Sequence, residues 1–309
     1  MAQHIRVILE YFHPWTNSAG FYYAREQGWY DEIGLDVELS TYDPHRGDTL
    51  AYLNRGEGQF GIFPTNRLLV LRERTDGSSV IGIAAINHGG MEAIHAIKGR
   101  GIETPADLSG KRIAMNPTPR GLAMVKHLIQ ANGGVPEFEV VDAGYRELEA
   151  HDLAAGTADA TFGSYWAWEL LLNSSVPDEE RIIWPVDDIK APLYHSYLLG
   201  ANEAFAKENP EVVKAFLDVT KRGFEAVAAN PAAAAEIYEK TIPYFPSYLI
   251  KESLPLIATT WLYEGKWGVQ QEHYMEAYAY WLYDNGILKD RDSWKTAYTN
   301  GYLPVETKQ

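Results

Sequence analysis

The sequence predicts an α/β protein in which strands and helices alternate. Residues 5–9 form a short apolar run that is typical of a buried strand, and residues 19–28 follow with a helical pattern that ends at Gly28. A second strand is expected at residues 34–39. Because strand, helix and strand follow one another, we expect a parallel sheet, with a ligand site beyond the carboxyl ends of its strands.

The same alternation continues along the chain of 309 residues, which is long enough for two lobes of ordinary size. We expect a discontinuous lobe I, made of residues 1–90 and 198–309, and a lobe II made of residues 91–197. In the first part of lobe I, the apolar pattern predicts a helix, a strand, a helix and a strand at residues 48–54, 60–63, 66–74 and 80–86.

Lobe II is expected to start with a short helix that Thr104 caps and Pro105 opens. The pattern then predicts strands at residues 111–115, 140–141 and 160–162, and helices at residues 121–131 and 147–154. The first of these helices has one apolar face, which consists of Leu122, Val125, Leu128 and Ile129.

The chain is expected to return to lobe I through residues 197–199. Asn209 then caps a helix that Pro210 opens, and the spacing of its apolar residues predicts one buried face, made of Val213, Phe216, Leu217 and Phe224. A further helix at residues 274–285 is stopped by Gly286.

The composition excludes several classes of function. Lys and Arg total 27 against 42 Asp and Glu, so the net charge of −15 argues against a nucleic-acid partner. There is no cysteine, which removes disulfides, thiolate nucleophiles and cysteine-based zinc sites. The histidines do not form a metal-binding pair on a helix, and we expect no metal, no cofactor and a monomer.

Several motifs resemble a known family. Trp15-Thr16-Asn17 before the first helix and the turn at residues 34–37 resemble the opening of solute receptors that serve ABC importers for thiamine pyrimidine precursors. Further matches lie at residues 61–63, 107–113, 202–205 and 209–211. Nitrate, sulfonate and taurine receptors share the fold and the Gly-Leu-Asp-Val turn, whereas Trp-x-Asn is more particular to the pyrimidine receptors.

This resemblance implies the fold and the partners. The expected fold is a bilobal, type II periplasmic-binding-protein-like clamshell of two doubly wound lobes, with the ligand cleft between them. The resemblance also implies a small-molecule ligand, an ABC permease as partner, and a periplasmic or extracellular, membrane-associated location. Receptors of this kind carry an export signal or lipoprotein segment, which we expect to have been trimmed from this sequence.

Aromatic residues are numerous, with 9 Trp, 20 Tyr and 10 Phe, and their rings could hold an aromatic ligand by stacking. Trp15 and Tyr22 are the strongest candidates, although they could instead pack the first helix onto the sheet. Trp166 belongs to the segment 163–169, which follows a predicted strand and should face the cleft from lobe II.

Polar groups must orient such a ring. An aminopyrimidine presents N–H donors beside ring-nitrogen acceptors, so an amide or a carboxylate can pair with it, and Asn17, Glu92 and Glu169 are candidates. Asn17 could instead be a helix cap, and each Glu could be a solvated surface residue. Arg120 precedes a helix and suits an anionic or carbonyl oxygen. The full set of expected ligand contacts is Trp15, Asn17, Tyr22, Phe63, Asn66, His88, Glu92, Arg120, Trp166, Glu169, Tyr194 and His195.

An enzymatic function is the alternative of a different class. A fungal-type pyrimidine synthase shares the fold and uses a pyridoxal-phosphate lysine with a nearby histidine, but Phe63 and Arg67 stand at the matching positions here. Without an amine at that point no Schiff base can form there. The cysteine-rich run of the synthase is replaced by residues 191–197, a departure that also keeps a riboflavin receptor open beside sulfonate, taurine and nitrate receptors. We therefore expect a binding protein and not an enzyme.

Overall fold

The computed structural model describes residues 2–74, 78–144, 150–164, 176–243 and 245–304. The chain divides into two compact units, which we treat separately. Unit 1 contains Met1–His88 and Tyr194–Gln309, and unit 2 contains Gly89–Leu193. The lobe boundaries expected from the sequence lie after residues 90 and 197.

Unit 1 is built on a five-stranded mixed sheet with the strand order β2-β1-β3-β10-β4. Strand β1 is parallel to β2 and β3, as predicted, whereas β10 is antiparallel to β3 and β4. The parallel pairing expected from the first strand-helix-strand unit is therefore confirmed, and the antiparallel β10 is the strand that follows the second crossing between the units. The strands are β1 (Gln3–Ile8), β2 (Leu35–Ser40), β3 (Phe60–Pro64), β4 (Val80–Ala85) and β10 (Tyr197–Asn202).

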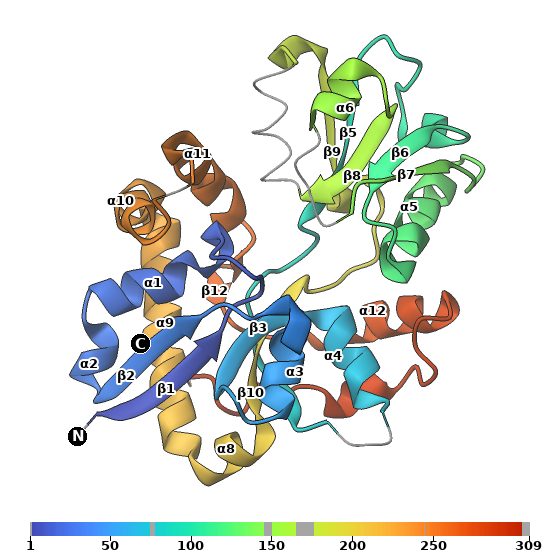
Figure 1. Cartoon of the computed structure of the whole chain (residues 1–309). Coiled ribbons are helices and arrows are strands. Elements are labelled where there is room, and N and C mark those ends of the chain that lie inside the picture. The colour runs from blue at the N-terminus through green and yellow to red at the C-terminus, as the bar shows by residue number, and fades with distance from the viewer. Residues whose placement is uncertain (1, 75–77, 145–149, 165–175, 244, 305–309) are drawn as a thin grey trace. The chain divides into compact units, whose positions relative to one another are not determined.

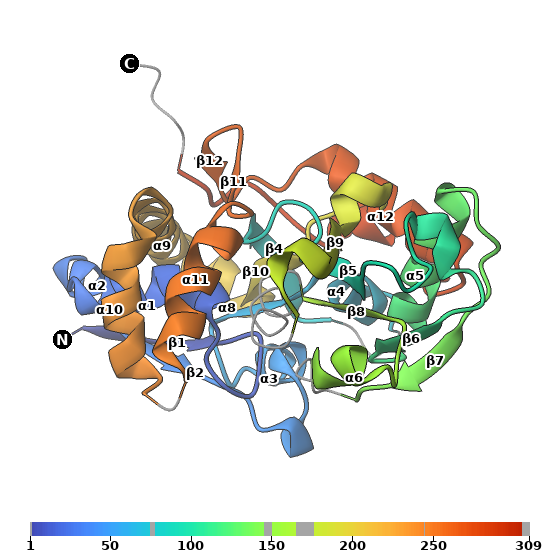
Figure 2. The same ribbon diagram turned by 90° about the horizontal axis from the view of Figure 1, so that it is seen from above.

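Helices cover both faces of this sheet, with α9 on one face and α3 on the other (Figure 1, Figure 2). Within the described ranges, no helix is both long enough and apolar enough to cross a membrane. The helices of unit 1 are α1 (Ala19–Glu26), α2 (Trp29–Glu32), α3 (Thr49–Asn54), α4 (Thr65–Arg72), α8 (Glu203–Glu208), α9 (Pro210–Ala229), α10 (Pro231–Thr241), α11 (Ser247–Ala258) and α12 (Glu272–Asp284). A short hairpin, β11 (Leu262–Tyr263) and β12 (Lys266–Trp267), precedes α12.

Helix α9 forms the core of unit 1 together with α1. The predicted apolar face of α9 is buried as expected, and Phe216 stacks on Phe60 of β3 with ring centroids 4.0 Å apart. The two helices are in close contact at Gly20 and Gly223. A Cβ on Gly223 would lie only 2.3 Å from the carbonyl oxygen of Gly20, so the contact requires glycine there. This close packing fixes the start of α1, and therefore the loop that precedes it.

The expected cap of α9 is wrong in one respect. Asn209 stands before Pro210 at the start of α9, but its amide Nδ2 donates to the carbonyl of Phe205 at 3.0 Å, in the preceding helix α8. Asn209 is both the residue that ends α8 and the residue that precedes α9, and its side chain forms a hydrogen bond to α8. Asn202 caps α8 itself, accepting from the Phe205 backbone N–H at 3.1 Å.

Unit 2 also contains a five-stranded mixed sheet, with the strand order β7-β6-β8-β5-β9. Strand β6 is parallel to β7 and β8, and β5 is antiparallel to β8 and β9. The sequence pattern does not predict β5 and β9. The elements are β5 (Glu92–Ile97), β6 (Arg112–Met115), β7 (Glu139–Asp142), β8 (Ala160–Ser164), β9 (Arg181–Pro185), α5 (Pro119–Ala131) and α6 (Ala150–Ala155).

The helix cap predicted for unit 2 agrees with the structure. The apolar face predicted for α5 differs at one residue. Thr104 and Asp107 form a reciprocal capping box around a 3₁₀ turn that Pro105 opens. In α5, Met124 is fully buried, whereas Leu122, which was expected on the buried face, is only half-buried. One-turn 3₁₀ segments complete the chain at Thr16–Ser18 (η1), Pro44–Arg46 (η2), Pro105–Leu108 (η3), Asp178–Glu180 (η4), Val186–Ile189 (η5) and Ser293–Thr296 (η6).

The chain enters unit 2 through a turn that Asp187 holds. The backbone N–H of Gly90 donates to both carboxyl oxygens of Asp187, at 3.0 and 2.9 Å. Gly89 has a φ of 90°, and a Cβ there would lie 2.3 Å from Asp187 Oδ2. Both the backbone conformation and the space at this position therefore require glycine.

We expect Gly89→Ala to destabilise the protein by about 2 kcal/mol or more, because it combines a left-handed backbone with a clash against a hydrogen-bonded carboxyl. Gly99→Ala is the matched control, since Gly99 has a φ of 76° but open space around its Cβ position. Urea unfolding of both variants measures the difference. Equal losses of stability would show that Asp187 does not constrain the turn.

Candidate functional site

The loop that follows β1 carries a cluster of aromatic rings. Tyr11, Phe12, His13 and Trp15 are near neighbours, and Phe245 joins them from the segment between α10 and α11. The His13 and Trp15 rings are 4.6 Å apart between centroids, and those of Trp15 and Phe245 are 5.2 Å apart. We call residues 11–15 the aromatic loop. It lies beyond the carboxyl end of a parallel strand, where α/β proteins bind ligands.

Hydrogen bonds to its backbone hold Trp15 in place. Its carbonyl oxygen accepts from the Tyr238 hydroxyl and, at 2.7 Å, from the Ser18 hydroxyl. The side chain of Trp15 is half-buried. A ring that is fixed by its backbone and still partly open loses little conformational freedom when a ligand stacks on it.

Asn17 belongs to a buried amide network and is not the cap of α1, a position that Ser18 occupies. Asn17 and Asn87 donate to each other's side-chain oxygens at 3.1 and 2.9 Å. Trp261 Nε1 also donates to Asn17 Oδ1 at 3.0 Å, and Asn87 Nδ2 donates to Thr260 Oγ1 at 2.8 Å. These bonds connect the first loop, the end of β4 and the end of α11.

Glu10, the residue between β1 and the aromatic loop, was not among the predicted contacts. Both of its carboxyl oxygens are buried, and neither has a hydrogen-bond partner of good geometry within the described part of the chain. Burial raises the pKa of Glu10 to about 7, although its own backbone N–H and the Asn17 amide are close enough to offset part of the rise. The structure thus places a protonatable, unsatisfied carboxyl beside the aromatic loop.

This carboxyl predicts a pH dependence of stability. Glu10 is protonated in both states below pH 4.5, whereas between pH 4.5 and 7 the unfolded chain ionises and the folded protein retains the proton. The free energy of unfolding of the wild type should therefore fall across this window relative to Glu10→Gln, which cannot titrate. Urea unfolding of both proteins at several pH values isolates this effect from other titrating groups. A difference that stays constant would contradict the burial of Glu10.

His88 and His195 form a second pair near the points where the chain leaves and re-enters unit 1. Their rings are 4.9 Å apart and edge-to-face, and His195 Nε2 accepts from the Gln271 backbone N–H at 2.9 Å. Burial lowers the pKa of His88 to about 4 and that of His195 well below its usual value, so both are neutral near pH 7. Neither imidazole therefore offers a cation to a ligand at that pH.

Other predicted contacts lie within the packing of unit 1. Tyr22 is 4% exposed, and its ring meets that of Tyr238 edge-on at 5.2 Å. Phe63 is 1% exposed and covers Gly200 of the neighbouring strand, where a Cβ would lie 2.3 Å from its ring. Tyr194 stacks on Tyr278 at 4.7 Å. Their contact with a ligand stays a prediction.

In unit 2 the structure joins two predicted contacts directly. Arg120, in the first turn of α5, forms an ion pair with Glu92 at the start of β5, and its Nη2 lies 3.4 Å from Glu92 Oε2. The guanidinium charge is thus largely neutralised within unit 2. Trp166 and Glu169 lie outside the described residues. Asn66, in the first turn of α4, lines a surface groove between α3 and α4 in unit 1.

Four residues of this site were not predicted from the sequence: Glu10, Asn87, Trp261 and Phe245. Glu10 had a detectable signal, because it is a carboxylate directly after a buried strand and directly before an aromatic run. The other three come from distant segments, and only the fold brings them to the first loop. Within the described ranges, no group of three or more His, Asp or Glu residues is arranged to hold a metal ion.

The two mixed sheets with their helices have the fold of the type II periplasmic binding proteins. The periplasmic aliphatic sulphonate binding protein SsuA of Escherichia coli has this fold, with a TM-score of 0.74 and 13% sequence identity, over 100% of this chain and 96% of that chain. The chain belongs to the NMT1/THI5-like family, whose model matches residues 15–234.

Two relatives in sequence differ in activity. The chain is 25% identical to the formylaminopyrimidine-binding protein of Halalkalibacterium halodurans over 234 residues, which are 75% of this chain and 69% of that protein. It is 26% identical to the 4-amino-5-hydroxymethyl-2-methylpyrimidine phosphate synthase of Aspergillus parasiticus over 236 residues, which are 74% of this chain and 68% of that protein. Similarity therefore leaves a choice between binding and synthesis.

Proposed function

We propose that this protein is the extracytoplasmic solute-binding receptor of an ABC importer, and that its ligand is a thiamine pyrimidine precursor such as formylaminopyrimidine or hydroxymethylpyrimidine. Its membership of the NMT1/THI5-like family and its similarity to a formylaminopyrimidine-binding protein support this ligand class. The proposed partner is the permease of the importer, and the proposed location is periplasmic or extracellular.

The single observation that carries the proposal is the unsatisfied carboxyl of Glu10 next to the aromatic loop. An aminopyrimidine presents an amine donor beside a ring-nitrogen acceptor, and a protonated carboxyl presents an O–H donor beside a carbonyl acceptor. The two edges are complementary and can form two hydrogen bonds side by side. Such a pair satisfies a buried group that otherwise costs free energy.

We expect Trp15→Ala to weaken pyrimidine binding by about 1 to 3 kcal/mol, because it removes stacking and buried apolar area from the aromatic loop. The fold should survive, since the side chain of Trp15 is only half-buried. Trp29→Ala is the matched control, because Trp29 on α2 packs against Tyr23 and Arg222, outside the aromatic loop. Calorimetric titration of the three proteins measures the effect. Wild-type affinity in Trp15→Ala would contradict the stacking role.

We propose binding and not synthesis, because the chain does not supply the synthase's amine. Phe63 is buried in β3, and Arg67 on α4 pairs with Asp48 at 3.0 Å. Phe63, at the position of the synthase lysine, has no amine that could form a Schiff base, and Arg67, at the position of the histidine, is protonated at every physiological pH. An absorbance band of a lysine aldimine in the purified protein, lost on borohydride treatment, would contradict the proposal.

A thermal-shift screen tests the ligand class. A ligand that binds only the native state stabilises it by about 2.7 kcal/mol at about 100 times its Kd. We expect formylaminopyrimidine or hydroxymethylpyrimidine to raise the melting temperature. Stabilisation by riboflavin alone would move the assignment to a flavin receptor.

A further inference from the structure

Helices α10 and α11 hold the short stretch that leads from the aromatic loop into α1. The two helices lie side by side (Figure 1, Figure 2). Each residue from Trp15 to Asn17 bonds to a different position on these helices or just after them, and the partners are Tyr238 on α10, Ser253 on α11 and Trp261, which follows α11. Three consecutive residues are thus fixed by a segment that lies 223 to 244 residues later in the chain.

Tyr238 makes the bond to Trp15. Its side chain is 1% exposed, and its hydroxyl donates to the Trp15 carbonyl and lies 3.1 Å from the Ser18 hydroxyl. Its ring meets the ring of Tyr22 on α1 edge-on, at 5.2 Å. The ring of Tyr238 therefore packs against α1, whereas its hydroxyl bonds to the aromatic loop. A phenylalanine at this position would keep the first contact and remove the second.

The segment between α10 and α11 contacts the ring of Trp15 as well. The Phe245 ring lies 5.2 Å from the Trp15 ring and 5.7 Å from the His13 ring, between centroids. The His13 ring is itself tilted against Trp15 at 4.6 Å. The position of Trp15 is thus set at its backbone by Tyr238 and at its ring by Phe245.

The next residue of the chain, Thr16, is held by α11. The Thr16 and Ser253 side chains are 3% and 1% exposed, and their hydroxyl oxygens are 3.2 Å apart. The two helices are also joined to each other, because Lys251 of α11 pairs with Glu239 of α10 at 3.1 Å and the Ser247 hydroxyl donates to the same carboxylate. Helices α10 and α11 therefore act on the loop together.

We propose that Tyr238 is a positioning residue for ligand binding, because through the Trp15 carbonyl it sets the place of the indole on which the ligand stacks. This inference rests on the proposed function, which assigns Trp15 to the ligand. A ring that is fixed before the ligand arrives loses little freedom on binding, so the same ring on a released backbone binds more weakly. Tyr238 acts through Trp15 and not by touching the ligand.

Fluorine NMR of the full chain labelled with 5-fluorotryptophan tests the positioning without any ligand. The chain contains 9 Trp, and the Trp15 signal is the one that disappears in Trp15→Phe. We expect Tyr238→Phe to shift or broaden the Trp15 signal, because the hydrogen bond that fixes its backbone is lost. A Trp15 signal with unchanged position and width would overturn the proposal.

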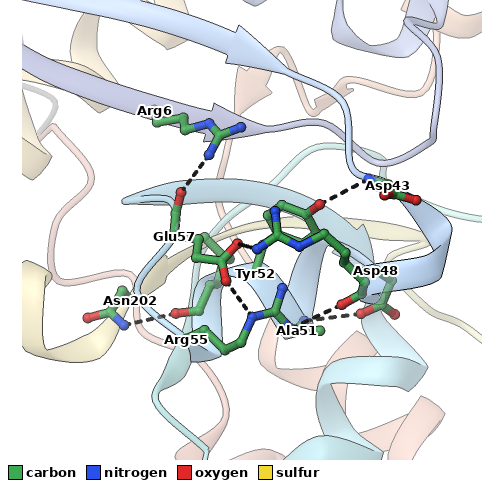
Figure 3. A network of polar contacts seen from close by, with 10 residues as sticks. Arg6, Asp43, Asp48, Ala51, Tyr52, Arg55, Glu57 and Asn202 are labelled. Carbon is green, nitrogen blue, oxygen red and sulfur yellow. Dashed lines mark hydrogen bonds and ion pairs between the residues drawn. The ribbon is translucent and has the colours of Figure 1, made fainter.

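Tyr52→Phe is the matched control. Tyr52 on α3 is 3% exposed, and its hydroxyl accepts from the Asp43 backbone N–H at 3.1 Å, as Figure 3 shows. This variant also loses a buried hydroxyl that bonds to the backbone of a loop, but the loop is the one after β2. We expect it to leave the Trp15 signal as in the wild type. A change as large as that in Tyr238→Phe would overturn the proposal, because the effect would then be a general result of losing a buried hydroxyl.

Calorimetric titration with formylaminopyrimidine tests the effect on binding. We expect Tyr238→Phe to raise the Kd about fivefold, as for the loss of one hydrogen bond, and Tyr52→Phe to leave it unchanged. In a Trp15→Ala background, Tyr238→Phe should have no further effect, because the ring that it positions is gone. Additive losses of affinity from the two substitutions would overturn the proposal, since Tyr238 would then act on the ligand by a route other than Trp15.

The two measurements separate this inference from the proposed function. A wild type that binds neither formylaminopyrimidine nor hydroxymethylpyrimidine would overturn the proposed function, and the fluorine signal would still decide whether Tyr238 positions Trp15. If the wild type and Tyr238→Phe bind formylaminopyrimidine with the same Kd, the proposed function stands and the positioning role of Tyr238 is overturned.

Discussion

Replacing Glu10 with methionine should raise the Kd for formylaminopyrimidine about 150-fold. The variant removes both hydrogen bonds of the proposed carboxyl–aminopyrimidine pair, each contributing about 1.5 kcal/mol, and a total of about 3 kcal/mol corresponds to this factor. Methionine has a similar volume and no charge, so the buried position should remain filled. Calorimetric titration measures the change.

Glu10→Gln is the control that separates pairing from charge. A neutral amide has a donor beside an acceptor, like a protonated carboxyl, and glutamine should retain most of the affinity near pH 7. If Glu10→Met binds formylaminopyrimidine as tightly as the wild type, Glu10 does not contact the ligand. If Glu10→Gln loses as much affinity as Glu10→Met, the contact requires an ionised carboxylate.

Asn17→Ala should destabilise the protein by about 4 kcal/mol. The substitution removes the acceptor of Trp261 Nε1 and the two hydrogen bonds between Asn17 and the Asn87 side chain, which leaves Asn87 Oδ1 without its donor, and Asn17, Asn87 and Trp261 are at most 2% exposed. Buried polar groups left without partners cost about 1 to 3 kcal/mol each, and the partners cannot reach water without opening the loop. Urea unfolding measures the loss.

Asn54→Ala is the matched control for this prediction. Asn54 is exposed at the end of α3, and its Oδ1 accepts from the Ser79 backbone N–H at 2.8 Å. Its replacement should cost less than 1 kcal/mol, as expected for an exposed hydrogen bond. A similar loss in both variants would show that the Asn17 network contributes no more than a surface contact.

Local patterns predicted the elements whose chemistry lies within a few residues. Thr104 caps its turn, Pro105 and Pro210 open theirs, and the apolar spacing in α9 identified its buried face. The elements that the sequence did not predict depend on strand pairing or on hydrogen bonds between residues that are far apart in the chain. Strand β5 contains a buried histidine, His95, in an otherwise apolar run, and its neighbours in the sheet come from later in the chain.

The candidate site was less predictable for the same reason. The aromatic character of the first loop was readable from Trp15, but Glu10 becomes notable only once its carboxyl is seen to be buried and unsatisfied. The helix cap expected at Asn17 is at Ser18, and the contact of Asn17 with a ligand stays a prediction; its partners in the structure are Asn87 and Trp261, 70 and 244 residues away. Contacts at such separations cannot be derived from one sequence.

The central claim, that this protein binds an aminopyrimidine, is tested most directly by calorimetric titration of the wild type. The ligands are formylaminopyrimidine, hydroxymethylpyrimidine, riboflavin, taurine and nitrate, each titrated into the same protein preparation. We predict saturable binding of a pyrimidine with a Kd of about 1 μM or lower, which corresponds to about −8.2 kcal/mol or more favourable, and no heat from taurine or nitrate. Saturable heat from taurine or nitrate alone, with none from either pyrimidine, would contradict the account.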